Sequence, residues 1–311
     1  MFKAFLKDSA IYGIGSILAR AISLLLLPFY TRVLTPRDYG VVDLLTTFGA
    51  LVNLTVALEI SQGLARYVAA AENEEERAEW ASTALWFTVG TLSLFAAIAF
   101  AFAGPLSAML LESRELAFVF GLGVISILFN GIFYVGQAQL RWMRKPAHYS
   151  TANLVFTVSA IVATVLFVLY FRFGVAGVVL GQMVGYLIGA VLTLWFARSD
   201  FRLKFSLEKC KRMLRFSLPL VPSSIAVFVA GYIDCIAIKE LMDVKDVGIY
   251  GVGYRLASPV ALLTAGFQTA ITPLVIANYK DPATRETIAR IFRYFLVVAM
   301  LACVGVSVFA R

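Results

Sequence analysis

The sequence predicts an all-α protein that crosses a membrane many times. Hydrophobic residues make up 60% of the chain, charged residues only 15%, and the mean hydropathy is +0.84. Soluble domains carry about 25% charged residues. The charges lie between long apolar stretches, each with the roughly 20 residues that a helix needs to cross a hydrocarbon core of about 30 Å. These stretches are too long, and too uniformly apolar, to be the strands of a membrane barrel.

Nine segments are long enough to span a bilayer as helices. The first follows two lysines as a signal peptide would, but it is too long and lacks a small-residue cleavage site, so we expect it to be retained. The expected helices cover residues 9–31, 38–66, 79–103, 115–140, 148–171, 174–197, 214–238, 246–277 and 286–310.

The distribution of basic residues predicts the orientation of these helices. With a cytoplasmic N-terminus, the inside loops carry 18 Lys and Arg and the outside loops carry 6. By the positive-inside rule, the N-terminus is expected on the cytoplasmic side of the membrane. The positive charge thus reflects topology and gives no reason to expect a nucleic-acid partner. The densest basic stretch, 198–215, would face anionic lipid, and the acidic run 72–79 is expected to be a solvated helix start.

An internal repeat is found when the chain is compared with itself at an offset of 208 residues. Three blocks align without a gap: KAFLKDS at 3–9 with KRMLRFS at 211–217, PRDYGVV at 36–42 with VKDVGIY at 244–250, and residues 73–89 with 281–297. The matches fall at helix starts, where an N-cap residue is followed three positions later by an acidic residue, as in a capping box. The equivalent pairs are Thr35 and Asp243 at the N-cap, Asp38 and Asp246 three residues later, and Gly40 and Gly248, expected to leave room for the preceding helix.

The repeat predicts two lobes with the same orientation in the membrane. Six helices separate equivalent points, and an even number gives a parallel repeat about an axis along the membrane normal. Residues 1–208 would form an N-terminal lobe of six helices, and residues 209–311 a partial C-terminal lobe of three. We therefore expect either a fragment of a protein with at least twelve helices or a chain that needs a partner.

Ionisable residues inside the expected helices are candidates for function. A central Arg costs roughly 2.5–3.5 kcal/mol on insertion scales, so such residues usually have a role. The candidates are Arg20, Arg255, Asp43, Glu59 and Asp234. The carboxylates could serve as counter-ions, with Glu59 facing Arg20 and either aspartate facing Arg255, or they could couple transport to an ion.

Polar residues at helical spacing give several helices one wet face. The residues are Ser16 and Ser23 beside Arg20, Asn53 on the second helix, Asn130 and Gln137 on the fourth, and Asn153 on the fifth. These faces predict a shared aqueous cavity; the alternative is hydrogen bonding between helices. Four glycines on the sixth helix, Gly177, Gly181, Gly185 and Gly189, instead predict close helix packing.

The sequence gives little support for an enzyme. It has one histidine and three widely spaced cysteines, which offer no metal-binding or disulfide pattern. No phosphate-binding glycine loop is found either, so we expect no bound cofactor and no direct use of ATP.

Two stretches identify a family resemblance. LLPFYTRVLTPRDYG at 26–40 and DVGIYGVGYRLASPV at 246–260, with Pro273 in the following TAITPLVIANY, resemble the helix starts of the polysaccharide biosynthesis family. In particular, they resemble its O-antigen flippase (Wzx-type) branch. This branch belongs to the MOP superfamily, with the MATE drug exporters and the lipid II flippases.

The resemblance implies a MATE-like two-lobed helix bundle that alternates between inward-open and outward-open states. Members move undecaprenyl-diphosphate-linked oligosaccharides from the cytoplasmic to the outer leaflet for surface polysaccharide and lipopolysaccharide synthesis. Arg20 and Arg255 would then contact the lipid diphosphate, for which a guanidinium is well suited, and the polar faces would meet the sugar. Membrane lipids, a polysaccharide polymerase and glycosyltransferases would be partners.

Two other functions stay open. In a MATE-like antiporter of drugs or cations, Asp43, Glu59 and Asp234 would bind H⁺ or Na⁺. A cationic cavity would disfavour this, because it repels cationic drugs. In a non-transporting scaffold for envelope assembly, substitutions in the cavity would be silent.

Overall fold

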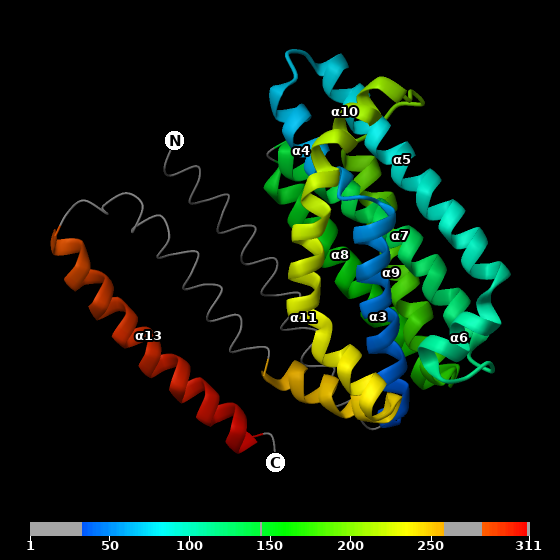
Figure 1. The fold of residues 1–311 in the computed structure, drawn as a ribbon, viewed down its shortest axis with the longest axis vertical. Coiled ribbons are helices and arrows are strands. Elements are labelled where there is room, and N and C mark those ends of the chain that lie inside the picture. Colours follow the sequence, from blue (N-terminus) through cyan, green and yellow to red (C-terminus); the bar gives the residue numbers. More distant parts are fainter. Residues whose placement is uncertain (1–32, 144, 258–281, 310–311) are drawn as a thin grey trace. The chain divides into compact units, whose positions relative to one another are not determined.

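The computed structural model describes residues 33–143, 145–257 and 282–309, almost all of them helical and none in a strand. The chain divides into two compact units, residues 1–249 and 250–311 (Figure 1). In the first unit, nine α-helices have both ends described, and a further helix begins at residue 244. The nine are α3 (Pro36–Val56), α4 (Ile60–Ala70), α5 (Glu74–Ala101), α6 (Ala103–Leu111), α7 (Ala117–Trp142), α8 (Pro146–Val165), α9 (Gly174–Phe196), α10 (Leu207–Ser217) and α11 (Val221–Leu241).

Six candidate membrane spans lie among the described residues, confirming a multi-pass helical membrane protein. They correspond to the second to seventh expected helices. The first, 9–31, lies outside the described residues, and of the eighth only residues up to 257 are described, where 244–257 are helical. Helices α10 and α11, which the repeat assigns largely to the second lobe, belong to the first compact unit, whose boundary follows Ile249.

The start of α3 has the predicted cap. Thr35 Oγ1 accepts a hydrogen bond from the Asp38 amide at 3.3 Å, and the Asp38 carboxylate accepts one from the Thr35 amide at 2.9 Å. In the second copy, the Asp243 carboxylate accepts a bond from the Asp246 amide at 2.9 Å. Both copies thus satisfy the exposed amides of a helix start with an acidic side chain.

The second expected helix, 38–66, is wrong as one element. α3 ends at Val56, and α4 begins at Ile60. Leu58 and Glu59 between them both have φ of 51°, in the left-handed region that a continuous right-handed helix cannot contain. The pattern of apolar residues runs through this break, and neither Gly nor Pro marks it.

Other boundaries also differ from expectation. α5 begins at Glu74, because Asn73 caps it by accepting a hydrogen bond from the Glu76 amide at 2.8 Å. The fifth expected helix ends in a π-helical turn, Leu166–Tyr170. The seventh is divided into α10, a 3₁₀ turn at Leu218–Leu220, and α11.

The first unit is a bundle in which α7 packs against α5, α8 and α9 (Figure 1). One apolar core joins α3, α7 and the start of the helix at 244, through residues such as Leu44, Phe120 and Val247. A second core joins α4, α5 and α10 around Leu64, Trp80 and Met213. Every described helix of the bundle packs against at least one neighbour, although α11 has a single buried residue, Phe228.

The predicted close packing of the sixth helix is confirmed. A Cβ atom added to Gly181 would lie 2.6 Å from the Thr164 backbone, and one added to Gly185 would lie 2.5 Å from Ala160 Cβ. Both neighbours are on α8, so the glycines let α9 and α8 approach almost backbone to backbone.

Gly40 and Gly248 also allow a close approach. The helix expected to approach Gly40, 9–31, lies outside the described residues, and the nearest atoms to Gly248 are not on its preceding helix. Each packs against the helix start of the other copy: Gly40 against Val244, and Gly248 against Pro36.

The segment between the repeats is fixed to α5. Ser82 Oγ accepts a hydrogen bond from the Arg202 amide at 2.8 Å, and Trp86 Nε1 donates one to the Arg202 carbonyl at 3.1 Å. Lys209 pairs with Glu79 at 2.6 Å, and Lys204 pairs with Glu75 at 3.3 Å. The acidic run 72–79 is therefore not simply solvated, since two of its carboxylates pair with the basic stretch 198–215.

Within the second unit, α13 (Pro282–Phe309) begins at a proline, as predicted for the first turn of a helix. Its stretch Phe292–Gly305 is apolar.

Candidate functional site

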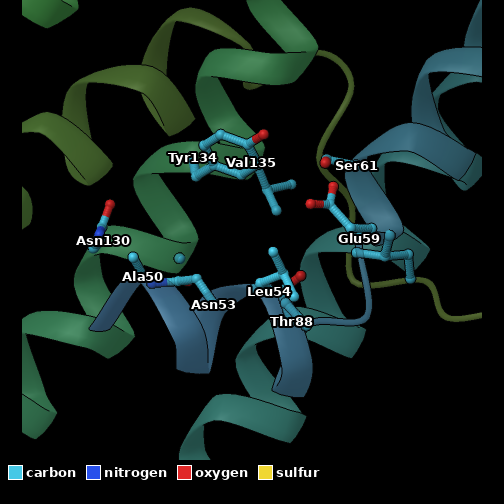
Figure 2. A pocket seen from close by; sticks show the side chains of 12 residues that line it. Ala50, Asn53, Leu54, Glu59, Ser61, Thr88, Asn130, Tyr134 and Val135 are labelled. Carbon is cyan, nitrogen blue, oxygen red and sulfur yellow. The ribbon is translucent and has the colours of Figure 1, made fainter. Parts of the chain in front are cut away.

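A pocket of about 220 Å³ lies where α3 breaks into α4 (Figure 2). Its lining comes from four helices and the break between two of them. The residues are Ala50, Asn53, Leu54 and Ala57 of α3 and its end, Glu59, Ile60 and Ser61 at the start of α4, Thr88 of α5, and Asn130, Gly131, Tyr134 and Val135 of α7. It joins the polar faces predicted on the second and fourth helices.

The helix break places Glu59 in this pocket. Glu59 is the N-cap residue of α4, with φ of 51° and ψ of 30°, and its side chain makes no capping hydrogen bond. Figure 2 shows its carboxylate directed toward the α7 side of the pocket, beside Ser61. A left-handed conformation costs about 1–2 kcal/mol for a residue with a Cβ, so the packing around α3 and α4 must hold it there.

α7 supplies the opposite wall. A Cβ atom on Gly131 would overlap Leu92 and lie 3.0 Å from Asn53 Oδ1, so glycine at this position lets the Asn53 amide reach α7. Asn130 and Tyr134 flank this contact one turn apart, and the Tyr134 side chain is 45% exposed. The wall thus offers an amide and a phenol around a small apolar floor.

The polar groups of the pocket divide into two sets. Thr88 donates to the Ala84 carbonyl at 2.9 Å, and Asn53 Nδ2 donates to the Gly49 carbonyl at 3.0 Å, so these groups are partly satisfied within their helices. Among the described residues, the side chains of Glu59, Ser61, Asn130 and Tyr134 have no hydrogen-bond partner. Ser61 as a residue is only 8% exposed, but its hydroxyl is not among the described buried polar atoms that lack a partner, so it is open to the pocket.

Among the described residues that line this pocket, Glu59 is the single charged one, and none of them is Lys or Arg. The pocket is therefore suited to a neutral or cationic group with several hydrogen-bonding atoms. It is unsuited to a phosphate or carboxylate, which Glu59 would repel.

Three of the candidate residues predicted from sequence, Asn53, Glu59 and Asn130, meet in this pocket. Gln137 is buried one helical turn beyond it, with its Nε2 unpaired, and half-buried Asn153 is on α8, outside the lining. Asp43, Asp234 and Arg255 are half-buried, and each takes part in an interaction. Ser16, Arg20 and Ser23 lie outside the described residues.

Ser61 and Thr88 were not among those candidates. Tyr134 follows Asn130 by four residues and lies on the polar face predicted for the fourth helix. Ser61 follows Asn53 and Ala57 at four-residue spacing, so the expected unbroken helix would also have put it on that face.

The fold defines the class of protein. The structure is similar to a multidrug resistance MATE family transporter of the MOP superfamily in an inward-facing conformation, with a TM-score of 0.66 and 19% identity. The alignment covers 93% of this chain and 69% of that one. The chain therefore has a MATE-like transporter fold.

The family follows from the sequence comparison. A family model described as polysaccharide biosynthesis protein matches residues 29–311, so the chain belongs to this family. Its relatives include a protein of the Lsg locus of Haemophilus influenzae, 22% identical over 86% of this chain, and the succinoglycan biosynthesis transport protein ExoT of Rhizobium meliloti, 26% identical over 74%. The matches span 65% and 45% of these relatives' lengths. The family and the structural neighbours are transporters, not enzymes.

Proposed function

We propose that this chain is part of a transporter that moves an undecaprenyl-diphosphate-linked oligosaccharide from the inner to the outer leaflet of the cytoplasmic membrane by alternating access. Membership of the polysaccharide biosynthesis family, together with the MATE-like fold, supports this proposal. The structural observation that supports it most directly is the pocket at the α3 break, whose unpaired amide, phenol and hydroxyl groups suit a sugar.

In this proposal, Arg20 and Arg255 contact the lipid diphosphate. A guanidinium makes paired hydrogen bonds to phosphate oxygens, and such contacts are strong where water is excluded. The diphosphate must then sit away from Glu59, because the pocket at the α3 break excludes anions. Asp43 and Asp234 would serve as counter-ions or couple transport to an ion.

The remaining polar candidates, Ser16, Ser23, Gln137 and Asn153, would face the sugars in a cavity between lobes 1–208 and 209–311. The N-terminus would lie in the cytoplasm, where glycosyltransferases make the substrate, and a polymerase would receive it on the other side. O-antigen is one glycan of this kind.

The test is transfer of a lipid-diphosphate-linked oligosaccharide across vesicles that contain the protein. Arg20→Ala is expected to abolish transfer, and Arg20→Lys to impair it, because an ammonium keeps the charge but loses the planar fork. Unchanged transfer by Arg20→Ala would contradict the diphosphate role. If the unaltered protein transferred no such lipid, the proposed function would be wrong.

A MATE-like cation antiporter is the second candidate, favoured by the lone carboxylate of Glu59 in its pocket. A gradient of H⁺ or Na⁺ should then drive uptake of an organic cation into the same vesicles. The flippase predicts no such uptake.

A further inference from the structure

The pocket at the α3 break is small and chemically distinctive. Its volume of about 220 Å³ lies below the roughly 300–1,000 Å³ of sites that enclose drug-sized ligands. A single ring with its substituents fits this space, whereas a chain of sugars does not.

The lining suits the two faces of such a ring. Leu54, Ile60 and Val135 offer apolar surface for C–H groups, and Tyr134 adds part of an aromatic ring at the mouth. Around them stand four side chains without partners among the described residues, Glu59, Ser61, Asn130 and Tyr134. Together they present both donors and acceptors, as neighbouring hydroxyl groups require.

Charge narrows the class of ligand further. A carboxylate accepts hydrogen bonds from two hydroxyls at once, and such charge-assisted bonds are the stronger kind. The same carboxylate repels an acidic group in a pocket whose described lining contains no Lys or Arg. Glu59 therefore both attracts hydroxyl groups and excludes acids.

We propose that this pocket binds one uncharged sugar ring of the transported glycan, and that Glu59 determines this specificity. The inference rests on the proposed function and adds the class of sugar that the first unit holds. The strained break between α3 and α4 has a role in this arrangement, because it brings Glu59 and Ser61 to face Asn130.

The test is protection of a cysteine placed in the pocket. Ala57 lines it, so Ala57→Cys can be alkylated by a maleimide, in a background where Cys235 and Cys303 are replaced by serine. The probes are the methyl glycosides of glucose, N-acetylglucosamine and glucuronic acid. The two neutral glycosides are expected to slow alkylation, and the glucuronide is not.

Three further variants test the specificity. Glu59→Gln should weaken protection by the neutral glycosides about 10- to 100-fold, the worth of a charge-assisted hydrogen bond, and should let the glucuronide protect equally well. Tyr134→Phe and Asn130→Ala each remove one hydrogen-bonding group of the pocket without changing the helix break. Each should weaken protection by the neutral glycosides. Glu112→Gln is the matched control, because Glu112 also has a left-handed backbone (φ 55°) but lies at the end of α6.

Equal protection by neutral and acidic glycosides in the unaltered pocket would overturn the proposal. So would protection by the neutral glycosides that Glu59→Gln leaves unweakened, or protection by Na⁺ and not by sugars, which would indicate an ion site. Transfer of the lipid-linked oligosaccharide, measured separately, distinguishes a failure of the sugar-pocket proposal from a failure of the proposed flippase function. Transfer without glycoside protection refutes only the sugar pocket, and protection without transfer refutes only the flippase.

Discussion

Gly40 and Gly248 occupy equivalent positions in the two copies of the repeat and make reciprocal contacts with one another's helix starts. A Cβ atom at Gly40 would overlap the Val244 carbonyl oxygen and lie 2.8 Å from its carbon, and one at Gly248 would overlap the Pro36 carbonyl oxygen and lie 2.7 Å from the Gly40 amide. Val244 follows Pro36 by 208 residues, as Gly248 follows Gly40. The two copies therefore meet through the same surface, as two subunits do across a two-fold axis.

This contact predicts that neither glycine tolerates a side chain. Gly40→Ala and Gly248→Ala should each destabilise the protein by about 1–3 kcal/mol, because the obstacle is backbone that cannot rotate away. Unfolding in detergent, followed by circular dichroism, measures the loss.

Gly90→Ala is the matched control, since nothing lies within 4 Å of its Cβ position in α5. There the change should stabilise the helix by up to about 1 kcal/mol. The double variant of Gly40 and Gly248 should lose less than the sum of the single losses, because both changes open one contact. Full additivity would mean that the two glycines do not share it.

The sequence predicted the repeated helix starts correctly, because their signals are local. Thr35 and Asp38 are three residues apart, and their hydrogen bonds need nothing from the rest of the fold. The contact of Gly40 with Val244 could not be predicted in the same way. A glycine indicates that something approaches closely, but not which element does so.

The pairing of Lys209 with Glu79 predicts a measurable coupling between α10 and α5. Their side chains are 18% and 32% exposed, so water screens this ion pair only partly. A double-mutant cycle with Lys209→Met and Glu79→Gln should give a coupling of about 1–2 kcal/mol in unfolding free energy.

The pair of Arg212 with Glu208 is the comparison, with a similar distance of 2.7 Å but exposures of 60% and 75%. Exposed pairs four residues apart on a helix contribute about 0.3–0.5 kcal/mol. Equal coupling in the two cycles would contradict the role assigned to burial.

Ser82 predicts how firmly the segment 198–206 is held. Its hydroxyl is fully buried, donates to the Ala78 carbonyl at 2.6 Å and accepts from the Arg202 amide at 2.8 Å. Ser82→Ala leaves that amide without its acceptor, at a cost of about 1–3 kcal/mol. Trypsin should then cleave faster after Arg198, Arg202 and Lys204.

Thr91→Ala serves as the control for this change, since the Thr91 hydroxyl bonds only to carbonyls of its own helix. Its tryptic pattern should match that of the unaltered protein. If Ser82→Ala gave the same pattern too, the hydrogen bond to Arg202 would not be what holds the segment.

Part of the candidate site followed from sequence, because helical spacing puts Asn53 and Asn130 on polar faces. The pocket itself did not, since it depends on a break that no Gly or Pro announces. The one available signal was Glu59, a charge in an expected membrane helix. That signal predicted a role for the residue but not the end of the helix at Val56.

The left-handed conformation of Glu59 predicts a conflict between stability and function. Glycine adopts this conformation without strain, so Glu59→Gly should raise the unfolding free energy by about 1 kcal/mol. It should also abolish protection of Ala57→Cys by neutral glycosides, because the carboxylate is gone. Glu112→Gly relaxes an equivalent strain at an exposed position and should stabilise the protein without changing protection. If Glu59→Gly instead destabilised the protein, the carboxylate would be holding the break together, and its place in the pocket would be structural and not a means of selecting a sugar.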